Sequence, residues 1–267
     1  MKFYKNFTAF QKAFFLFFTI ASIIVFLLPA FIPGGNVEEV FSVLGIIGII
    51  STLSGILVSI YTAKASISGY VWWWINTGTF AIIALAGNLY GQFIKNFLIL
   101  LPLQIYGFIA WRRNMNGNNS EEIAIRKFTT KNWIYAIIGV IICWGLYAIF
   151  LTELPNILNS LFNIKISKDP QVILDSFTSI LTITAVFLTG KRFIEQWYFW
   201  LVSNSLGVIM FIIQTVHAGI SNPSMFVGDL SNTISILQYG AGAVYGFILW
   251  RIMYKERMTN SSVLTKK

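Results

Sequence analysis

Residues 196–204, QWYFWLVSN, place aromatic and amide side chains inside an otherwise apolar stretch. On an α-helix, at 100° per residue, Trp197, Trp200 and Asn204 fall within an arc of about 60° and form one stripe. An indole face attracts flat cations, and an amide both donates and accepts hydrogen bonds. Because an amide without a partner in hydrocarbon costs on the order of a few kcal/mol, we expect Asn204 and the nearby Gln196 to face a cavity or a partner.

A second stripe precedes this one in the chain. Trp72 and Asn76 lie four residues apart, as Trp200 and Asn204 do. Asn76 is therefore also expected to face away from lipid. Together the two stripes predict a polar and aromatic site with contributions from both halves of the chain.

Composition places these stripes in a lipid bilayer. Of the 267 residues, 56% are hydrophobic and 11% are charged, and the mean hydropathy is +0.71. So little polar surface cannot coat a soluble globule. The single cysteine, Cys143, cannot build a disulfide framework or a cysteine metal cluster, so no metal is expected.

The apolar segments predict a single integral membrane domain of eight helices, because about 20 helical residues cross the hydrocarbon core. The segments cover residues 13–32, 40–62, 70–91, 93–111, 132–152, 172–189, 195–216 and 231–253, followed by a tail at 254–267.

The charges predict the orientation of these helices. With eight crossings, sixteen of the nineteen Lys and Arg residues fall on the side of the termini, and only Lys95, Lys165 and Lys168 fall on the other. Cytoplasmic loops collect basic residues, so both termini are predicted to be cytoplasmic. The net charge of +9 then reflects the membrane and does not indicate a nucleic-acid partner.

The chain also repeats itself. YGFIAWRR, which begins at Tyr106, and YGFILWRI, which begins at Tyr245, agree at six of eight positions. Helices 40–111 and 172–253 are therefore predicted to be two three-helix copies, joined by the linker helix 132–152 and preceded by one additional helix at 13–32. A single linker makes the copies parallel, in a 3+1+3 arrangement whose shared cavity both copies line.

Two blocks of residues resemble the PnuC-type vitamin transporters. The first block is NLYGQFIKNFLILLPLQIYGFIAW and the second is EQWYFWLVSN. The matching positions are Leu89, Tyr90, Gly91, Asn96, Leu101, Pro102, Gln104, Gly107 and Trp111, then Glu195, Trp197, Trp200 and Asn204. The extended loop after His217 departs from the family pattern.

This resemblance implies a SWEET-like fold, commonly trimeric, that imports a vitamin or vitamin precursor by facilitated diffusion across the inner membrane. In the best-known branch the cargo is nicotinamide riboside, which a cytoplasmic kinase traps by phosphorylation; related branches take thiamine or riboflavin. Trp197, Trp200 and Asn204 would contact the cargo, with Gln104 and Asn96 opposite. The full set of candidate substrate-binding residues is Trp72, Asn76, Asn96, Gln104, Gln196, Trp197, Trp200, Asn204 and Tyr239.

Several of these assignments have alternatives. Gln104 either lines the cavity or compensates backbone groups freed by Pro102, and Tyr239 either lines the cavity or packs the two copies together. Trp73 and Trp74 are assigned to the interfacial belt or to packing, and Trp72 is left between belt and site. Glu195 lies on the far side of its helix from Asn204 and is interpreted as a structural or gate residue.

Other functional classes fit the sequence less well. The only histidine, His217, has no catalytic setting, and neither a phosphate-binding loop nor metal-ligand spacing is present, so no enzyme activity or cofactor is expected. A thiamine or riboflavin carrier remains the main alternative to a nicotinamide riboside carrier. A SWEET-like sugar carrier and a membrane protein without transport activity are further alternatives.

Overall fold

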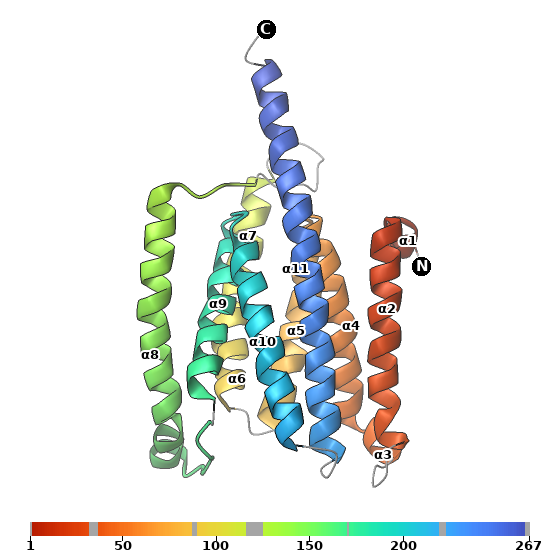
Figure 1. Cartoon of the computed structure of the whole chain (residues 1–267), viewed down its shortest axis with the longest axis vertical. Coiled ribbons are helices and arrows are strands. Elements are labelled where there is room, and N and C mark those ends of the chain that lie inside the picture. The colour runs from red at the N-terminus through yellow and green to blue at the C-terminus, as the bar shows by residue number, and fades with distance from the viewer. Residues whose placement is uncertain are drawn as a thin grey trace.

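The computed structural model describes residues 2–31, 37–86, 90–115, 125–169, 171–218 and 223–264. Within these ranges the chain forms eight long helices that stand side by side (Figure 1). They are α2 (Ala9–Leu27), α4 (Val43–Ala63), α5 (Gly69–Ala86), the joined α6 (Tyr90–Ile94), π-helical turn (Lys95–Leu100) and α7 (Leu101–Asn114), α8 (Thr130–Phe162), α9 (Val172–Gly190), α10 (Gln196–Ala218) and α11 (Pro223–Leu264). The short helices α1 (Lys2–Lys5) and α3 (Val37–Val40) flank α2.

Each of the eight predicted segments is helical, but several helices extend beyond their predicted ends. The linker helix α8 continues to Phe162 through Pro155, and α11 continues to Leu264 through most of the predicted tail. Apolar length marks only the part of a helix that lies in hydrocarbon, whereas Lys, Glu, Arg and Met continue a helix readily in water. The predicted boundary near Gly91 is also displaced, since α5 ends at Ala86 and α6 begins at Tyr90.

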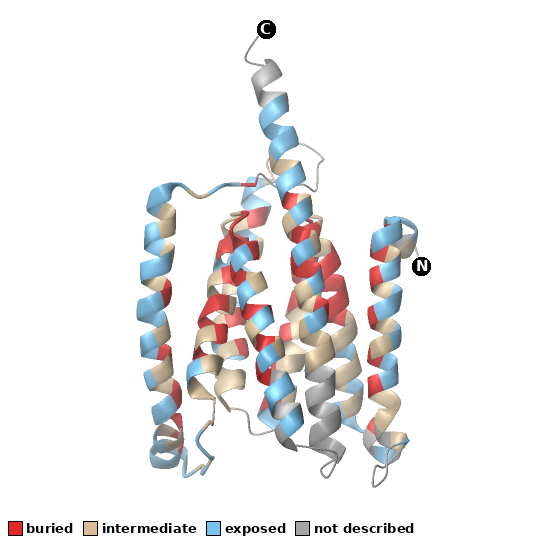
Figure 2. Ribbon diagram, in the orientation of Figure 1, coloured by how far each residue is buried: buried red, intermediate tan, exposed pale blue. Residues whose placement is uncertain are grey.

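Six of these helices, judged on the described residues alone, are long and apolar enough to cross a membrane. The surface agrees with that class, because large apolar side chains such as Ile138, Leu146 and Ile149 of α8 are exposed. Figure 2 shows that α8 is mostly exposed, that α2 mixes buried and exposed residues, and that burial concentrates in the helices between them. The chain is thus a multi-pass helical membrane protein. The membrane crossing of α5 and α10 stays a prediction.

The helix directions place both termini together. α2 begins and α11 ends at the same end of the bundle, which we call the terminal end (Figure 1). α4 and α9 both run toward the terminal end, and α5 and α10 both run away from it. We refer to α4 to α7 as the first group and to α9 to α11 as the second group.

The turns at the terminal end of the two groups have the same hydrogen bonds, 127 positions apart. The Ser66 N–H donates to the Tyr61 carbonyl over 3.0 Å, and the Phe193 N–H donates to the Leu188 carbonyl over 3.0 Å. Ala65 and Arg192, also 127 apart, both adopt a positive φ, of 54° and 66°. An offset of 127 positions therefore aligns the second group with the first, and we call this alignment the turn register.

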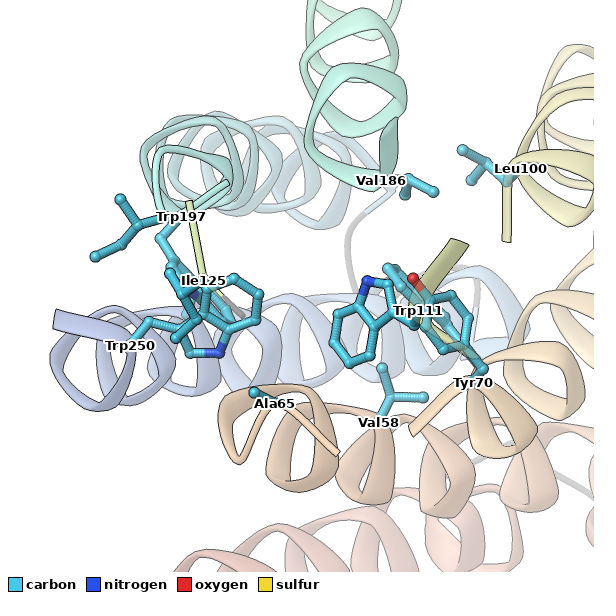
Figure 3. Packing of buried hydrophobic residues seen from close by; sticks show 12 residues of the cluster. Val58, Ala65, Tyr70, Leu100, Trp111, Ile125, Val186, Trp197 and Trp250 are labelled. Atoms are coloured by element: carbon cyan, nitrogen blue, oxygen red, sulfur yellow. The ribbon is translucent and has the colours of Figure 1, made fainter. Parts of the chain in front are cut away.

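Two indoles tie the groups together at this end. Trp111 Nε1 of the first group donates to the Thr189 carbonyl of the second over 2.7 Å, and Trp250 Nε1 donates to the Thr62 carbonyl over 3.0 Å. Thr62 and Thr189 are again 127 positions apart. The indoles themselves are almost completely buried and belong to one packed cluster (Figure 3).

α2 packs outside this assembly, against α4 and α11. Its buried Gln11 donates from Nε2 to the Tyr245 hydroxyl over 2.8 Å, and its Phe10 ring lies 4.4 Å from the Tyr245 ring. This contact fixes the additional helix to the second group at the α11 position that begins the repeated YGFI sequence.

Candidate functional site

Trp73 and Trp200 meet between the two groups. Their ring centroids are 6.1 Å apart with an interplanar angle of 44°. Because these residues are also 127 positions apart, each is the counterpart of the other in the turn register. Counterparts that touch must lie where the two groups face each other.

The first-group stripe was therefore predicted one residue out of register. Trp72 does not meet Trp200; it is half-buried and packs between the indole cluster and a second cluster that contains Phe7, Phe14 and Ile56. One residue turns a helix by 100°, so a shift of one position moves a side chain to another face. The similar sequences TAK, which begins at Thr62, and TGK, which begins at Thr189, are 127 positions apart and agree with the turn register.

The α10 stripe is largely buried. Trp197 is buried, with its ring edge-on to Trp250 at 5.8 Å and its tip against Gly246. Gln196 is fully buried and accepts a hydrogen bond from the Thr189 hydroxyl. Asn204 is 8% exposed and lies beside Gly240 of α11.

Several polar atoms of this stripe have no hydrogen-bond partner in the part of the chain that the structure describes. They are Trp197 Nε1, Gln196 Nε2 and Asn204 Nδ2, together with the Oε1 atoms of Gln104 and Gln238. Buried polar groups in proteins are nearly always paired. In a membrane protein, unpaired groups at one site indicate a place for water or a polar ligand.

Asn76 and Tyr239, by contrast, bind each other. The Tyr239 hydroxyl donates to Asn76 Oδ1 over 3.0 Å, and Asn76 Nδ2 donates to the Ser51 carbonyl over 2.8 Å. The counterpart contact in the second group is made by Ser203, whose hydroxyl donates to the Thr178 carbonyl over 3.0 Å. The structure thus brings these two candidates together in a contact between helices.

Gln104 and Asn96 lie on one buried stripe of the α6 to α7 helix. Gln104 Nε2 donates to the Thr77 hydroxyl over 2.7 Å, and Thr77 is the counterpart of Asn204. Asn96 Nδ2 donates to the Gln92 carbonyl over 2.8 Å within the π-helical region that precedes Pro102. Asn96 therefore supports the irregular backbone, and Gln104 joins α7 to α5 within the first group.

Three further residues join the candidate site, and the sequence reasoning had left the last of them between lining the cavity and packing the two copies. They are Trp73, Thr77 and Gln238, the last of which donates from Nε2 to Ser59 Oγ over 2.6 Å and to the Gly55 carbonyl over 3.1 Å. The turn register would have identified Trp73 and Thr77, because it pairs them with Trp200 and Asn204. Leu89 and the side chain of His217 lie outside the described residues.

The described members of the candidate site include no carboxylate, lysine, arginine or histidine side chain. Charged side chains within the helices lie elsewhere: Lys95 Nζ donates to Ser179 Oγ over 3.3 Å, and Asp175 Oδ1 accepts from Gln92 Nε2 over 2.8 Å. A hollow of about 520 Å³ lined by residues such as Trp144, Phe177 and Leu206 also lies apart from it. The site therefore offers stacking and neutral hydrogen bonds.

Eight long helices with apolar outer surfaces, and with aromatic and amide side chains buried among them, define a multi-pass helical membrane protein. The model of the family described as nicotinamide mononucleotide transporter matches residues 45–252. The chain belongs to this family, which confirms the resemblance identified in the sequence.

Named transporters of this family are similar to the chain. A nicotinamide riboside transporter PnuC from Neisseria mucosa is 25% identical over 210 residues, which cover 78% of this chain and 72% of the relative. A nicotinamide riboside transporter PnuC from Haemophilus influenzae is 26% identical over 211 residues, covering 79% and 81%. The crystal structure of a vitamin B3 transporter PnuC superimposes with a TM-score of 0.69 over 94% of each chain, at 23% identity, which supports the fold.

Proposed function

We propose that this chain carries nicotinamide riboside across the inner membrane by facilitated diffusion. The observation that carries the proposal is the contact between Trp73 and Trp200, beside the unpaired polar atoms of Gln104 and Asn204. The names of the relatives specify the cargo, and the site supplies matching chemistry.

The chemistry of the cargo fits a neutral aromatic site. Nicotinamide riboside is a flat cation that bears an amide and ribose hydroxyls. Indole faces attract such cations by about 0.5 to 2 kcal/mol, depending on desolvation. The unpaired amide atoms can bind its polar edge, and the lack of a carboxylate among the described site residues keeps binding weak enough for release.

The proposed arrangement is a parallel 3+1+3 bundle with α8 as the linker and α2 as an additional helix. The paired turns, the reciprocal indole bonds and the shared helix directions support it. The terminal end, which carries Arg112, Arg126 and Arg192, faces the cytoplasm in this proposal. From the family resemblance we also propose a trimer and a cytoplasmic kinase that traps the cargo.

Competition binding on the purified protein tests the cargo. Calorimetry with nicotinamide riboside, thiamine and riboflavin should show binding of nicotinamide riboside, and Trp200→Ala should abolish it. Trp144→Ala, on α8 and away from the site, serves as the matched control and should retain binding. If folded protein binds thiamine or riboflavin in preference, the cargo is reassigned; if it binds none of the three, the proposed transport function is wrong.

A further inference from the structure

A short segment covers the terminal end of the indole cluster. Residues 125–128, which precede α8, form this segment, and we call it the lid. Ile125 of the lid is only 8% exposed and packs in the same cluster as Trp197 and Trp250 (Figure 3). The lid lies at the terminal end of the bundle, where the α10 stripe begins (Figure 1).

Two backbone hydrogen bonds and several side-chain contacts hold the lid, among them the Arg126 guanidinium over the Phe193 ring at 4.5 Å. The Arg126 N–H donates to the Arg192 carbonyl over 2.8 Å, and the Ile194 N–H donates to the Arg126 carbonyl over 2.9 Å. The Phe128 ring lies edge-on to Phe193 at 4.8 Å. The lid is therefore paired with the turn between α9 and α10 by a two-bond bridge, which is a small amount of structure to break.

Glu195 connects this turn to the lid. Two backbone N–H groups favour its charged form, that of Phe128 in the lid and that of Glu195 itself. The side chain is 3% exposed, and its Oε2 has no hydrogen-bond partner among the described residues. Burial raises the pKa of Glu195, while the Phe128 N–H and the charge of Lys127 oppose that rise.

The turn itself does not require a carboxylate at this place. The counterpart of Glu195 in the first group is Ser68, whose hydroxyl pairs with Ser66 Oγ at 2.9 Å. The two turns share their backbone hydrogen bonds, so the same fold forms with a short hydroxyl side chain. The buried acid therefore needs an explanation other than turn formation.

We propose that Glu195 is a positioning residue that sets how readily the lid opens. One carboxylate oxygen holds the lid closed through Phe128, while the unpaired oxygen favours the open state, because water reaches it only when the lid lifts. Gln196 and Trp197 follow directly in the chain, so opening at Glu195 would uncover the α10 stripe. As a step in cargo release, this role rests on the proposed function.

Cysteine labelling measures lid opening without any cargo. In a Cys143→Ser background, Ile125→Cys places one thiol under the lid, and a membrane-impermeant maleimide reports its exposure in inside-out vesicles. Glu195→Gln keeps an acceptor oxygen for Phe128 and replaces a buried charge by a neutral amide, whose burial costs less free energy, so labelling should slow by about tenfold. Glu195→Ala removes the hydrogen bond and should speed labelling.

Glu153→Gln is the matched control, because it makes the same substitution at an exposed carboxylate near the opposite end of α8. Equal labelling rates for the Glu195→Gln and Glu153→Gln variants would overturn the proposal. Hydrogen exchange of residues 125–128 in the parent protein and in Glu195→Gln gives the same comparison without the introduced cysteine. It therefore decides the matter if the cysteine variant does not fold.

A cargo measurement separates this proposal from the proposed function. Uptake of nicotinamide riboside by Glu195→Gln should fall severalfold, while the calorimetric Kd changes less than twofold. Loss of binding in parallel with uptake would make Glu195 part of the site and would contradict a role in the lid alone. If the parent protein does not bind nicotinamide riboside, the proposed cargo fails, and the labelling rates still decide the role of Glu195.

Discussion

Asn76 and Asn204 carry the same amide in different surroundings. Asn76 bonds the Ser51 carbonyl and the Tyr239 hydroxyl, whereas Asn204 Nδ2 has no partner in the described chain. Asn76→Leu should destabilise the protein by about 1 to 3 kcal/mol, because it leaves two groups unpaired. Asn204→Leu should retain or raise stability and weaken nicotinamide riboside binding by about tenfold or more.

Thermal unfolding in detergent and calorimetric Kd values for both leucine variants check this contrast. Equal losses of stability with unchanged affinity would identify Asn204 as a packing residue. That result would remove the main polar contact from the proposed site.

Trp72 and Trp73 give the corresponding test of register. Trp73 meets Trp200 between the groups, whereas Trp72 packs partly toward the α2 side. Trp73→Ala should therefore weaken binding as strongly as Trp200→Ala, and Trp72→Ala should lower the unfolding temperature with little change in Kd. Quenching of indole fluorescence by the cargo, lost only in the Trp73 and Trp200 variants, provides an independent measurement. If Trp72→Ala weakened binding more than Trp73→Ala, the alignment of Trp72 with Trp200 would be correct instead.

At the scale of the helices, glycines set how closely neighbouring elements approach. A Cβ at Gly246 of α11 would overlap the Trp197 ring, and a Cβ at Gly107 of α7 would overlap the Tyr70 hydroxyl. Tyr70 and Trp197 are counterparts in the two groups, so each group packs an aromatic ring on a glycine. Close backbone approach through small residues is a common way to pack membrane helices.

Gly246→Ala should accordingly destabilise the protein by about 1 to 3 kcal/mol and displace Trp197 from the α10 stripe. Gly139→Ala on α8 is the matched control, because nothing lies within 4 Å of its added Cβ. Unfolding midpoints and binding of both variants check the prediction. Equal behaviour of the two variants would mean that α10 and α11 can separate freely at this contact.

The helices themselves could be predicted because crossing a bilayer imposes a long apolar segment, and all eight segments are helical. Register could not be read from the Trp and Asn spacing alone, because adjacent tryptophans at 72, 73 and 74 allow more than one alignment. The pairing of Asn76 with Tyr239 joins residues 163 positions apart, and a single sequence gives no signal for such a contact. The lid was missed for the same reason, since Ile125 lies in a connection without apolar periodicity.

At the scale of the whole molecule, the charged residues and the candidate site are separate. The sequence assigns sixteen of the nineteen basic residues to segments on the side of the termini, which we propose to be cytoplasmic, whereas the candidate site is neutral in its described part. In a carrier whose binding site is neutral, the net charge moved in each transport cycle equals the charge of the cargo. For a cation such as nicotinamide riboside, each crossing therefore moves one positive charge.

Facilitated diffusion of a cation should then follow the membrane potential with no coupled ion. A potential of 100 mV, negative inside, is worth about 2.3 kcal/mol per charge, which corresponds to roughly 50-fold accumulation at equilibrium. Proteoliposomes with a potassium diffusion potential and radiolabelled nicotinamide riboside measure this ratio, and the uncharged dihydro form of the same riboside should only equilibrate. Accumulation driven by a pH gradient at zero potential would instead reveal proton coupling. Lys95 and Asp175, which are half-buried and hydrogen-bonded within the helices, would then be the first residues to substitute.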